Sequence, residues 1–410
     1  RNLKKMKMKY LHRTIENVLP KQSAFYKGVL LSGMRQVGKS TLLKQIGEQR
    51  RYLTLNNSRL LRMAKEAPEE FLVLNPPPVT IEEVQWAPEL FPALKAAFDE
   101  TEDRGLVWLS GSQRLSLWSQ VADKLPGRVA SFDLMPFSIY ERQGLGLSQK
   151  PYIPSLNLPR LLKPKTVSET WDIIFQGAWP DVLRADNDTR EIFYDQLINL
   201  YIANDVVQLN SIEKRLEFQK FLAVLATRSG QELNYSDLSK DCGINLPTVK
   251  AWLSIVEASG LVFLLPPFYE NIEKRLVKSP KMYFVDTGLV CFLLDIQSSE
   301  ELSRYYNRGA IFETFVISEI LKSWVHNAKS PSFYFYRDFE KSEVDLLIHD
   351  SGVYYPIEIK SSVTVSSKKL TGLEAFKKNV KNSAMASVIS MTPEPYVMEG
   401  QVINHSIWDI

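Results

Sequence analysis

The first third of the chain alternates short apolar runs of strand type with segments of helical periodicity. The helical pattern after the first run places Leu42, Leu43 and Ile46 on one face. The sequence therefore predicts a strand, a glycine-rich turn and a helix, with two further strands downstream. The three strand-type runs are "GVLLSG" (28–33), "VTI" (79–81) and "GLVWLSGSQ" (105–113).

The middle of the chain begins with a connector and continues with a helical pattern. Residues 142–168 are rich in Gly, Pro, Ser and Leu, which is typical of a connecting segment. A turn at Gly177 and Pro180 then precedes an amphipathic helix in "REIFYDQLINLYIANDVVQL" (190–209). Its apolar positions are Ile192, Phe193, Leu197, Leu200, Tyr201 and Ile202.

A helix-turn-helix pattern follows, with a turn at Gly243 and Pro247 early in the second helix. A hairpin of "LVFLLPPF" (261–268) and "KMYFVD" (281–286) would complete a winged helix. Winged helices serve both DNA and protein contacts, so both uses remain open here. The apolar helix positions are Leu233 and Leu238 in the first helix and Val249, Trp252, Leu253 and Val256 in the second. The residues that could meet DNA are Lys250 on the second helix and Lys274, Arg275, Lys278 and Lys281 near the hairpin.

The C-terminal pattern is one helix, three strands, a helix and a strand. The last residues, "NHSIWDI", could dock through Trp408 and offer no chemistry. The histidines His326, His349 and His405 show no metal-ligand spacing, and we expect them to be ordinary surface or strand residues. The runs are "RGAIFETFVISEILKSW" (308–324), "SFYFYRD" (332–338), "EVDLLIHD" (343–350), "VYYPIEIKSS" (353–362), "LTGLEAFKKNV" (370–380) and "SAMASVIS" (383–390).

Composition indicates several domains and sets few limits on partners. With 410 residues, 45% of them hydrophobic, the chain exceeds the size of roughly 250–300 residues at which single cores stop growing. The formal net charge of +3 neither demands nor excludes a polyanionic partner, so any nucleic-acid surface must be local. Cys242 and Cys291 are too few for a disulfide framework or a structural zinc site, and we expect both to be small core residues.

The sequence shows no targeting or membrane-spanning segment. No run approaches the roughly 20 apolar residues of a membrane span, and the basic start "RNLKKMKMKYLHR" lacks the apolar stretch of a secretory signal. We therefore expect a soluble cytoplasmic protein with no membrane partner. A chain that begins with Arg1 rather than Met also suggests that the true N-terminus is missing or processed.

The glycine-rich turn after the first strand carries a phosphate-binding motif. Gly33, four intervening residues and the series Gly38, Lys39 and Ser40 match the Walker A pattern between strand and helix. Backbone N–H groups of such a loop close around phosphates, Lys39 supplies a positive charge, and Ser40 offers a hydroxyl to Mg²⁺. Thr41 would add a phosphate contact at the helix start. We therefore expect ATP and Mg²⁺ as cofactors.

Acids and hydroxyls at the ends of the next two strands would complete this site. Glu82 and Glu83 close the second strand-type run, where they could hold the metal and polarise water. Ser110 and Ser112 lie at the end of the third run and could sense the γ-phosphate.

These motifs resemble those of a prokaryotic family of AAA+ ATPases that carry a C-terminal nuclease-like domain. The resemblance spans nearly the whole chain and implies a parallel-sheet P-loop core followed by a helical lid. The turn at Gly177 and Pro180 would belong to the lid, although a plain helical spacer fits the same pattern. The motifs are the Walker A series, "EEVQWAPEL" (82–90), "LSGS" (109–112) and "PGR" (126–128).

The resemblance also implies roles for single residues. Glu83 would be the catalytic acid, Ser110 or Ser112 the first sensor, and Arg128 an arginine finger for a neighbouring subunit of a homo-oligomeric ring, with a hexamer favoured. Arg128 fits a solvated loop arginine almost as well. The family has Asp where this chain has Glu82, whose extra methylene moves the carboxylate by about 1.5 Å. That difference bears on the hydrolysis rate more than on nucleotide binding.

Four C-terminal residues have the chemistry of a metal-dependent nuclease. Glu358 and Lys360 lie two apart on a predicted strand and share a face, and strand pairing can bring Asp345 beside Glu358. The carboxylates could hold Mg²⁺, Lys360 could orient or deprotonate water, and Glu313 could complete the metal shell. The arrangement resembles PD-(D/E)xK nucleases, most of all the branch with archaeal Holliday-junction resolvases. Such folds also survive as inactive DNA-binding platforms.

The sequence thus predicts an α/β multidomain ATPase, and two functions fit it. The first is a ring-forming motor that hydrolyses ATP and remodels branched DNA such as Holliday junctions. The second is an ATP-dependent oligomerising switch in defence or regulation, with a catalytically inactive nuclease fold. The predicted domains are an AAA+ core with a basic N-terminal segment (1–150), a linker and helical lid (151–215), a winged helix (216–290) and an α/β PD-(D/E)xK nuclease-like domain (291–410).

Overall fold

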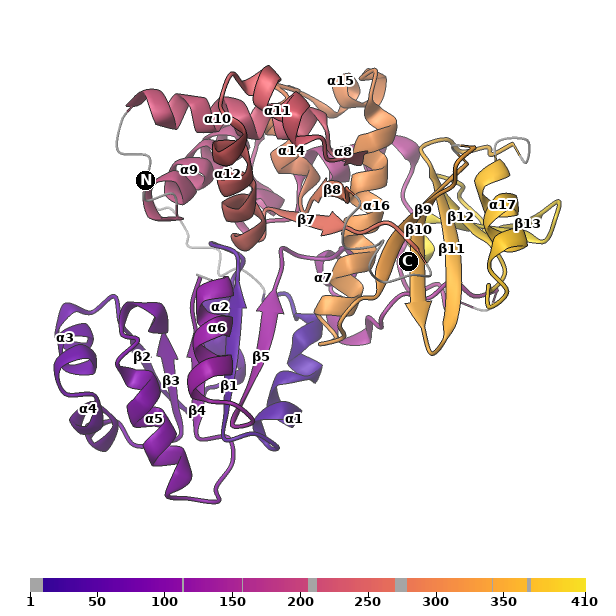
Figure 1. Cartoon of the computed structure of the whole chain (residues 1–410). Coiled ribbons are helices and arrows are strands. Elements are labelled where there is room, and N and C mark those ends of the chain that lie inside the picture. The colour runs from indigo at the N-terminus through magenta and orange to yellow at the C-terminus, as the bar shows by residue number, and fades with distance from the viewer. Residues whose placement is uncertain are drawn as a thin grey trace, which may run out of the picture.

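The structure of the chain is a computed structural model. Its described residues form three sheets, of five, six and three strands, with helices around and between them (Figure 1). The structure describes residues 10–112, 114–156, 158–205, 212–269, 279–340, 342–366 and 370–410.

The N-terminal part is built on a five-stranded sheet in which every neighbouring pair is parallel. In β1, Val29 and Leu31 enter one buried core and Leu30 enters another, as expected for a strand covered on both faces. The three predicted strands are confirmed, and β2 and β5 were not predicted. In spatial order the strands are β2 (Arg51–Thr54), β3 (Val79–Glu82), β4 (Val107–Ser110), β1 (Gly28–Gly33) and β5 (Val129–Leu134).

Short helices of 4 to 11 residues surround this sheet. The predicted helix after the glycine-rich turn is confirmed as α2, which begins at Lys39. The flanking helices are α1 (Leu19–Ser23), α2 (Lys39–Ile46), α3 (Ser58–Glu66), α4 (Pro68–Leu74), α5 (Leu90–Asp99), α6 (Arg114–Lys124) and α7 (Ile139–Arg142), with short 3₁₀ turns η1 (Thr14–Asn17), η2 (Val84–Trp86) and η3 (Gly146–Ser148).

The middle region is mainly helical and lies above the N-terminal sheet in Figure 1. Side chains of Asn234 and Asn245 cap the starts of the two predicted helices, and Gly243 ends the first in a left-handed conformation (φ 74°). The predicted hairpin is confirmed as β7 and β8, and β6 adds a third strand to it. The elements are α8 (Val167–Gln176), η4 (Asp181–Arg184), α9 (Asn187–Asp205), α10 (Ile212–Thr227), β6 (Gln231–Glu232), α11 (Tyr235–Cys242), α12 (Leu246–Ala258), β7 (Val262–Leu265) and β8 (Lys281–Phe284).

One expectation for the hairpin is wrong. Lys281 does not reach outward from a wing, because it begins β8, is 4% exposed and forms ion pairs with Glu313 and Glu343. Lys250 of α12 is exposed, as expected. The other three basic residues assigned to the wing, Lys274, Arg275 and Lys278, lie outside the described residues.

The C-terminal part is a six-stranded mixed sheet packed between α16 and α17. The predicted order of helix, three strands, helix and strand is confirmed, and β13 and β14 follow it. In spatial order the strands are β13 (Tyr396–Met398), β14 (Val402–Ser406), β12 (Ser387–Ser390), β11 (Val353–Lys360), β10 (Glu343–Asp350) and β9 (Phe333–Arg337). The helices are α14 (Thr287–Leu293), α15 (Ser299–Arg304), α16 (Arg308–Val325) and α17 (Thr371–Asn379), and η6 (Ile407–Asp409) ends the chain.

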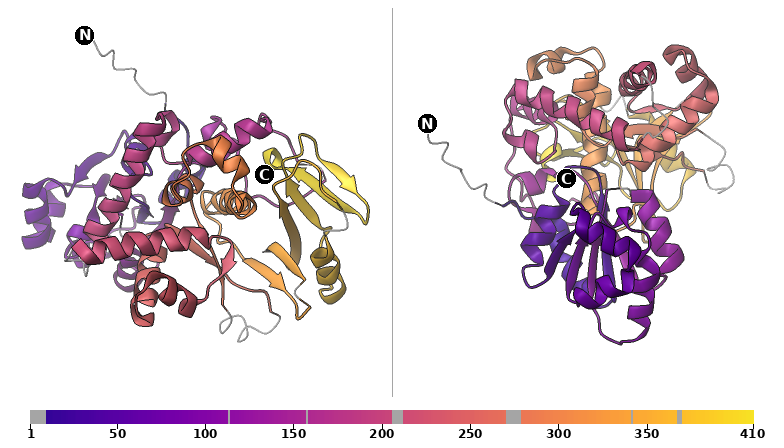
Figure 2. Two further views of the ribbon diagram at one scale, coloured as in Figure 1. Left: turned by 90° about the horizontal axis from the view of Figure 1, so that it is seen from above. Right: turned by 90° about the vertical axis from the view of Figure 1, so that its left-hand side faces the viewer.

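One hydrophobic core joins these parts. It contains Val29 and Leu31 of β1, Trp252 of α12, Phe312 of α16 and Trp408 at the C-terminus. The two cysteines are buried in the same core, as the sequence predicted. The views in Figure 2 show α16 between the N-terminal sheet and the C-terminal sheet. Within the described ranges, no helix combines the length and apolar character that crossing a membrane requires.

Candidate functional site

The glycine-rich turn leaves β1 at a point where only glycine fits. A Cβ on Gly33 would lie 2.3 Å from the carbonyl oxygen of Leu134, and its φ of 145° is also unfavourable for other residues. Gly38 stands at the start of α2 with a φ of 94°. The turn therefore presents its backbone N–H groups at the first turn of α2, where a phosphate is favoured.

Lys39 lies folded over this turn. Its Nζ donates hydrogen bonds to the carbonyl oxygens of Gly33 and Met34, at 2.8 and 2.7 Å. Burial lowers the pKa of the Lys39 ammonium to about 8, although the nearby charges of Glu83 and Asp133 act in the opposite direction. A bound phosphate would add negative charge beside this buried ammonium and favour its charged form.

The predicted metal-holding pair is brought together. Ser40 Oγ is in hydrogen-bond contact with the carboxylate of Glu82, which ends β3. Both are hard oxygen ligands of the kind that Mg²⁺ prefers, so the residues present fit this ion despite the longer Glu82 side chain. The phenol of Tyr52 lies beside the same carboxylate, and burial together with Glu82 raises the pKa of Tyr52.

Glu83 has a left-handed backbone conformation. Its φ of 59° lies in the left-handed region, which disfavours residues with a side chain. This conformation ends β3, and the Glu83 carboxylate lines the nucleotide cavity and contacts the amide of Gln85. Gln85 also donates a hydrogen bond to Ser112 Oγ at 3.4 Å, so the predicted catalytic acid and one sensor candidate share a partner.

The two sensor candidates differ in position. Ser112 lines the nucleotide cavity, as do Ser40 and Thr41. Ser110 ends β4 directly opposite Glu82 in the neighbouring strand, and its hydroxyl is buried with no hydrogen-bond partner among the described residues. Each hydroxyl thus lies close to one of the residues, Glu82 or Glu83, that are predicted to hold the metal and to polarise the attacking water.

A cavity of about 640 Å³ surrounds the Walker A turn. This volume lies within the roughly 300–1,000 Å³ of small-molecule sites. Two groups of lining residues were not predicted. The N-terminal segment contributes Tyr10, Leu11 and Arg13, and the turn after α8 contributes Pro180, Asp181, Leu183 and Arg184. No local pattern marks Arg13, because it is 24 residues from the turn that it contacts.

Arg128 lies at the opposite end of the sheet from the Walker A turn. Its carbonyl oxygen accepts a hydrogen bond from the N–H of Gly28, the first residue of β1. Its guanidinium pairs with Asp99 at 2.6 Å. Arg128 therefore does not reach the nucleotide cavity of its own chain, and its role as a finger for a neighbouring subunit stays a prediction.

The four predicted C-terminal residues converge on one buried cluster. Asp345 Oδ2 accepts a hydrogen bond from the N–H of Ile359 at 2.7 Å, which fixes it beside β11. The Lys360 ammonium contacts the Glu358 carboxylate, and the hydroxyl of Tyr283 donates to Glu313 at 2.6 Å.

A second lysine, missed by sequence reasoning, belongs to the cluster. Lys281 Nζ lies 3.6 Å from Glu313 and contacts Glu343. Burial would lower the pKa of Lys281, but the charges of Glu313, Asp345 and Glu343 raise it. Lys281 is thus held as a cation among carboxylates.

Electrostatic repulsion in the cluster is only partly relieved. Burial, followed by the charge of Asp345, raises the pKa of Glu313 to about 7 and that of Glu358 to about 8. Burial also raises the pKa of Asp345. One carboxylate oxygen of Glu358 has no hydrogen-bond partner in the described part of the chain. Such a site gains from a bound cation, although no three His, Cys, Asp or Glu side chains in the described ranges are arranged closely enough to hold one as they stand.

The histidines differ from expectation at one position. His326 is neither a surface nor a strand residue, because it follows α16 and is fully buried against Glu141. His349 lies in β10, where it stacks on Tyr354. His405 lies in β14, and burial lowers its pKa to about 4.

Comparisons with known proteins agree with the nucleotide site. Residues 26–143 match the family model of an AAA domain. Models of two domains of unknown function match residues 168–300 and 308–408. The chain is 26% identical over 340 residues to uncharacterized proteins of Mycobacterium bovis and Mycobacterium tuberculosis, which covers 82% of this chain and 71% of each relative.

A solved structure with some similarity is the Walker-type ATPase of Pyrococcus abyssi. It is 17% identical, with a TM-score of 0.40, and the match covers 69% of this chain and 96% of that chain. The AAA match and the Walker A geometry together make the N-terminal part a P-loop ATPase domain. The two models that match the rest of the chain assign it neither a nuclease nor a DNA-binding role.

Proposed function

We propose that the chain hydrolyses ATP and uses the cycle to remodel branched DNA, such as a Holliday junction, that its C-terminal domain grips. The observation that carries this proposal is the buried cluster of Glu313, Asp345, Glu358 and Lys360 in the same molecule as a P-loop ATPase site. Acids and lysines gathered in this way suit the handling of a phosphodiester.

The nucleotide half of the proposal assigns roles to residues that already meet. Backbone N–H groups of the Walker A turn and the Lys39 ammonium would bind the phosphates. Ser40 and Glu82 would hold Mg²⁺, which supplies charge neutralisation on the phosphates when bound. Glu83 lines the cavity and would orient the attacking water and accept its proton. Ser112 would report the presence of the γ-phosphate.

The DNA half rests on two regions. The C-terminal cluster offers Lys360, which is partly exposed and faces Glu358, to a phosphate that enters beside it. The helix α12 carries the exposed Lys250 on what would be the recognition helix of a winged helix. We further propose a homo-oligomeric ring, with a hexamer favoured, in which the Arg128 of one subunit approaches the nucleotide of the next.

The test is an ATPase assay of the full chain with a four-way DNA junction, with linear duplex of equal length, and without DNA. The proposal expects turnover that the junction stimulates more than the duplex does, with binding that weakens as salt rises, because phosphate contacts release counterions. Lys39→Ala serves as the control for contaminating ATPase. Turnover indifferent to DNA, together with no salt-sensitive binding, would overturn the DNA half and leave the ATPase intact.

A nucleotide-dependent switch is the second candidate. The observation that favours it is the buried polar contact between the ATPase domain and α16, in which Glu141 meets His326 at 3.2 Å. A switch predicts slow turnover and an oligomeric state set by nucleotide. Size-exclusion chromatography with light scattering, in ADP and in a non-hydrolysable ATP analogue, distinguishes it from a steadily cycling motor.

A further inference from the structure

Arg13 is a buried cation inside the wall of the nucleotide cavity. It is 2% exposed, and its guanidinium lies 4.4 Å from the ring centroid of Phe137. One terminal nitrogen donates to the carbonyl oxygen of Val37 in the Walker A turn at 2.9 Å, and the other donates to that of Met135 at 2.6 Å. A Cβ added to Gly38 would lie 3.9 Å from the guanidinium. Arg13 thus supports the turn that would hold the phosphates.

Glu141 holds Arg13 in place. Its carboxylate lies 3.1 Å from Arg13 Nε and accepts hydrogen bonds from the backbone N–H groups of Thr14 and Ser138, at 2.8 and 2.9 Å. Burial alone would raise the pKa of Glu141, but Arg13 and then His326 hold it well below its usual value. A fully buried carboxylate that stays ionised depends on these partners.

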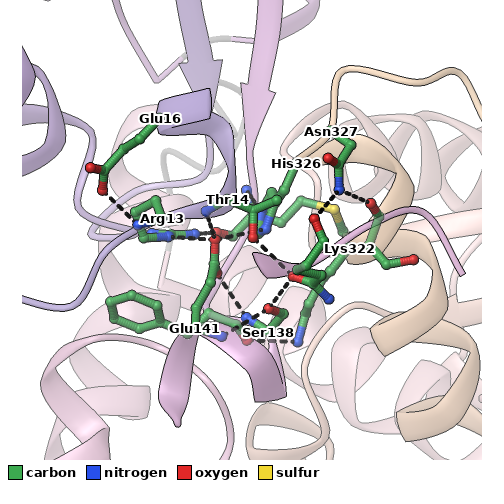
Figure 3. A network of polar contacts seen from close by, with 12 residues as sticks. Arg13, Thr14, Glu16, Ser138, Glu141, Lys322, His326 and Asn327 are labelled. Carbon is green, nitrogen blue, oxygen red and sulfur yellow. Dashed lines mark hydrogen bonds and ion pairs between the residues drawn. The ribbon is translucent and has the colours of Figure 1, made fainter. Parts of the chain in front are cut away.

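One of these partners, His326, belongs to the C-terminal domain (Figure 3). His326, directly after α16, places Nδ1 3.2 Å from Glu141. Its Nε2 accepts a hydrogen bond from the N–H of Met135 at 3.2 Å. An accepting Nε2 carries no proton, so the ring proton lies on Nδ1, which is 3.2 Å from the carboxylate but outside hydrogen-bond geometry.

Two neighbouring residues of α16 reinforce the same contact. Glu319 accepts a hydrogen bond from the N–H of Ile139 at 2.7 Å. Lys322 donates to the carbonyl oxygen of Phe137 at 3.2 Å and pairs with Glu319 at 2.7 Å. The segment from 135 to 141, which carries one end of the Arg13 contacts, is therefore held by the end of α16 rather than by the ATPase domain alone.

We propose that His326 is a positioning residue for the nucleotide site. The chain of contacts runs from His326 through Glu141 and Arg13 to the carbonyl of Val37, so the C-terminal domain supports Arg13, a lining residue of the ATPase cavity. This inference rests on the proposed nucleotide binding. Without His326, Glu141 loses a partner and the N–H of Met135 loses its acceptor. Arg13 and the Walker A turn would then be less ordered in the free protein. Because nucleotide binding would have to order them, the affinity for nucleotide would fall.

The test compares nucleotide affinity in three variants of the full chain. His326→Ala removes the link, His326→Gln keeps a donor and an acceptor, and Ser318→Ala is the matched control. Ser318 is buried on the same helix, but its hydroxyl bonds to the carbonyl of Val285 instead of the ATPase domain. Calorimetric titration with ADP and Mg²⁺ gives the dissociation constant, and a thermal melt checks folding.

We expect His326→Ala to weaken ADP binding about tenfold, a change of about 1.4 kcal/mol. His326→Gln should recover part of the loss, and Ser318→Ala should bind as the wild type does even if it melts at a lower temperature. Wild-type affinity in His326→Ala would overturn the positioning role. Failure of the wild-type chain to bind any nucleotide would instead overturn the proposed ATPase function, so the two failures are distinguishable.

A measurement on the unmodified protein covers the case in which His326→Ala does not fold. Coupling between two sites is reciprocal, so nucleotide must stabilise the contacts of His326 as much as those contacts stabilise nucleotide. Hydrogen exchange of peptides 131–142 and 319–328 should slow when ADP is added, whereas peptide 371–379 of α17 should not change. Equal exchange of the first two peptides with and without ADP, at saturation, would contradict the proposal.

Discussion

The nucleotide site and the C-terminal cluster treat buried charge in opposite ways. In the first, the Lys39 ammonium donates hydrogen bonds to two backbone carbonyls and lines a large cavity in which an anion could bind beside it. In the second, the carboxylates of the cluster lie together with Lys281 and Lys360, and burial, followed by repulsion from Asp345, raises the pKa values of Glu313 and Glu358. The comparison teaches that burial disfavours the charged form of a lysine in the first site and of carboxylates in the second, and that a ligand of opposite charge would favour the charged form in each.

The largest expected effect tests the first half of this comparison. Lys39→Ala should reduce ATP binding or hydrolysis at least about 100-fold, because it removes the buried cation that faces the phosphates. Lys44→Ala is the matched control, since Lys44 lies on the same helix but stacks over the Tyr52 ring outside the cavity lining. Nucleotide titration and phosphate release measure the two steps. Unchanged turnover in Lys39→Ala would contradict the P-loop assignment.

Glu83→Gln should separate binding from chemistry. The amide keeps the shape of the side chain but cannot accept a proton from water, so ATP should bind while hydrolysis falls about 100-fold. Single-turnover phosphate release with pre-bound ATP measures this loss. Should Glu82→Gln alone stop hydrolysis while Glu83→Gln does not, the roles of the two acids are exchanged.

The role of the C-terminal cluster is tested by removing its charged side chains one at a time. If it cleaves DNA with Mg²⁺ or Mn²⁺, then Asp345→Ala, Glu358→Ala and Lys360→Ala should each abolish cleavage of a labelled four-way junction, while ATP hydrolysis persists. Asp350→Ala, at the far end of the same strand as Asp345, is the control. Junction binding without cleavage in either metal would indicate an inactive, DNA-gripping fold.

Arg128 tests whether one nucleotide site needs a second subunit. We expect Arg128→Ala to lower turnover about tenfold, less than removal of Lys39 does, because a finger stabilises charge that Lys39 and the metal already share. Mixing Arg128→Ala with Lys39→Ala should restore part of the activity at interfaces where two intact halves meet. The control is Arg104→Ala, another arginine of exposed loops. A mixture that co-assembles and stays inactive would argue against a shared site.

The two sites also differ in how much of them could be predicted. The Walker A residues lie in one short segment, so spacing alone predicted Lys39 and Ser40 at the start of a helix, where both line the cavity. The C-terminal acids lie on separate elements, and secondary-structure order was needed to bring Asp345 and Glu358 together. Lys281 was assigned to a wing because basic residues surround it in sequence. In the fold it is buried and forms an ion pair with Glu313 of the cluster.

Long-range contacts explain the rest. Arg13 and His326 meet Glu141 from positions more than a hundred residues away, and no periodicity or motif reports such a pairing. Burial of a charge is decided by the packing of α16 against the ATPase domain, which is a property of the assembled fold. The elements of the fold were predictable because their signals are local, while the contacts between domains were not.

The smallest expected effect, and the sharpest for the cluster, is on stability as a function of pH. The pKa of Glu358 is raised to about 8 by burial and by Asp345, so between its ordinary value and pH 8 the folded chain holds a proton that the unfolded chain releases. Stability must therefore fall as pH rises through this window. Glu358→Gln removes the carboxyl group and with it this loss of stability at high pH. The substitution should raise the melting temperature by about 2 °C at pH 8, which corresponds to about 1 kcal/mol, and by less at pH 5. Thermal melts at both pH values measure the difference, with Glu374→Gln on the exposed side of α17 as the control. An equal shift at both pH values would mean that burial and Asp345 do not raise the pKa of Glu358, and the contrast between the two sites would not hold.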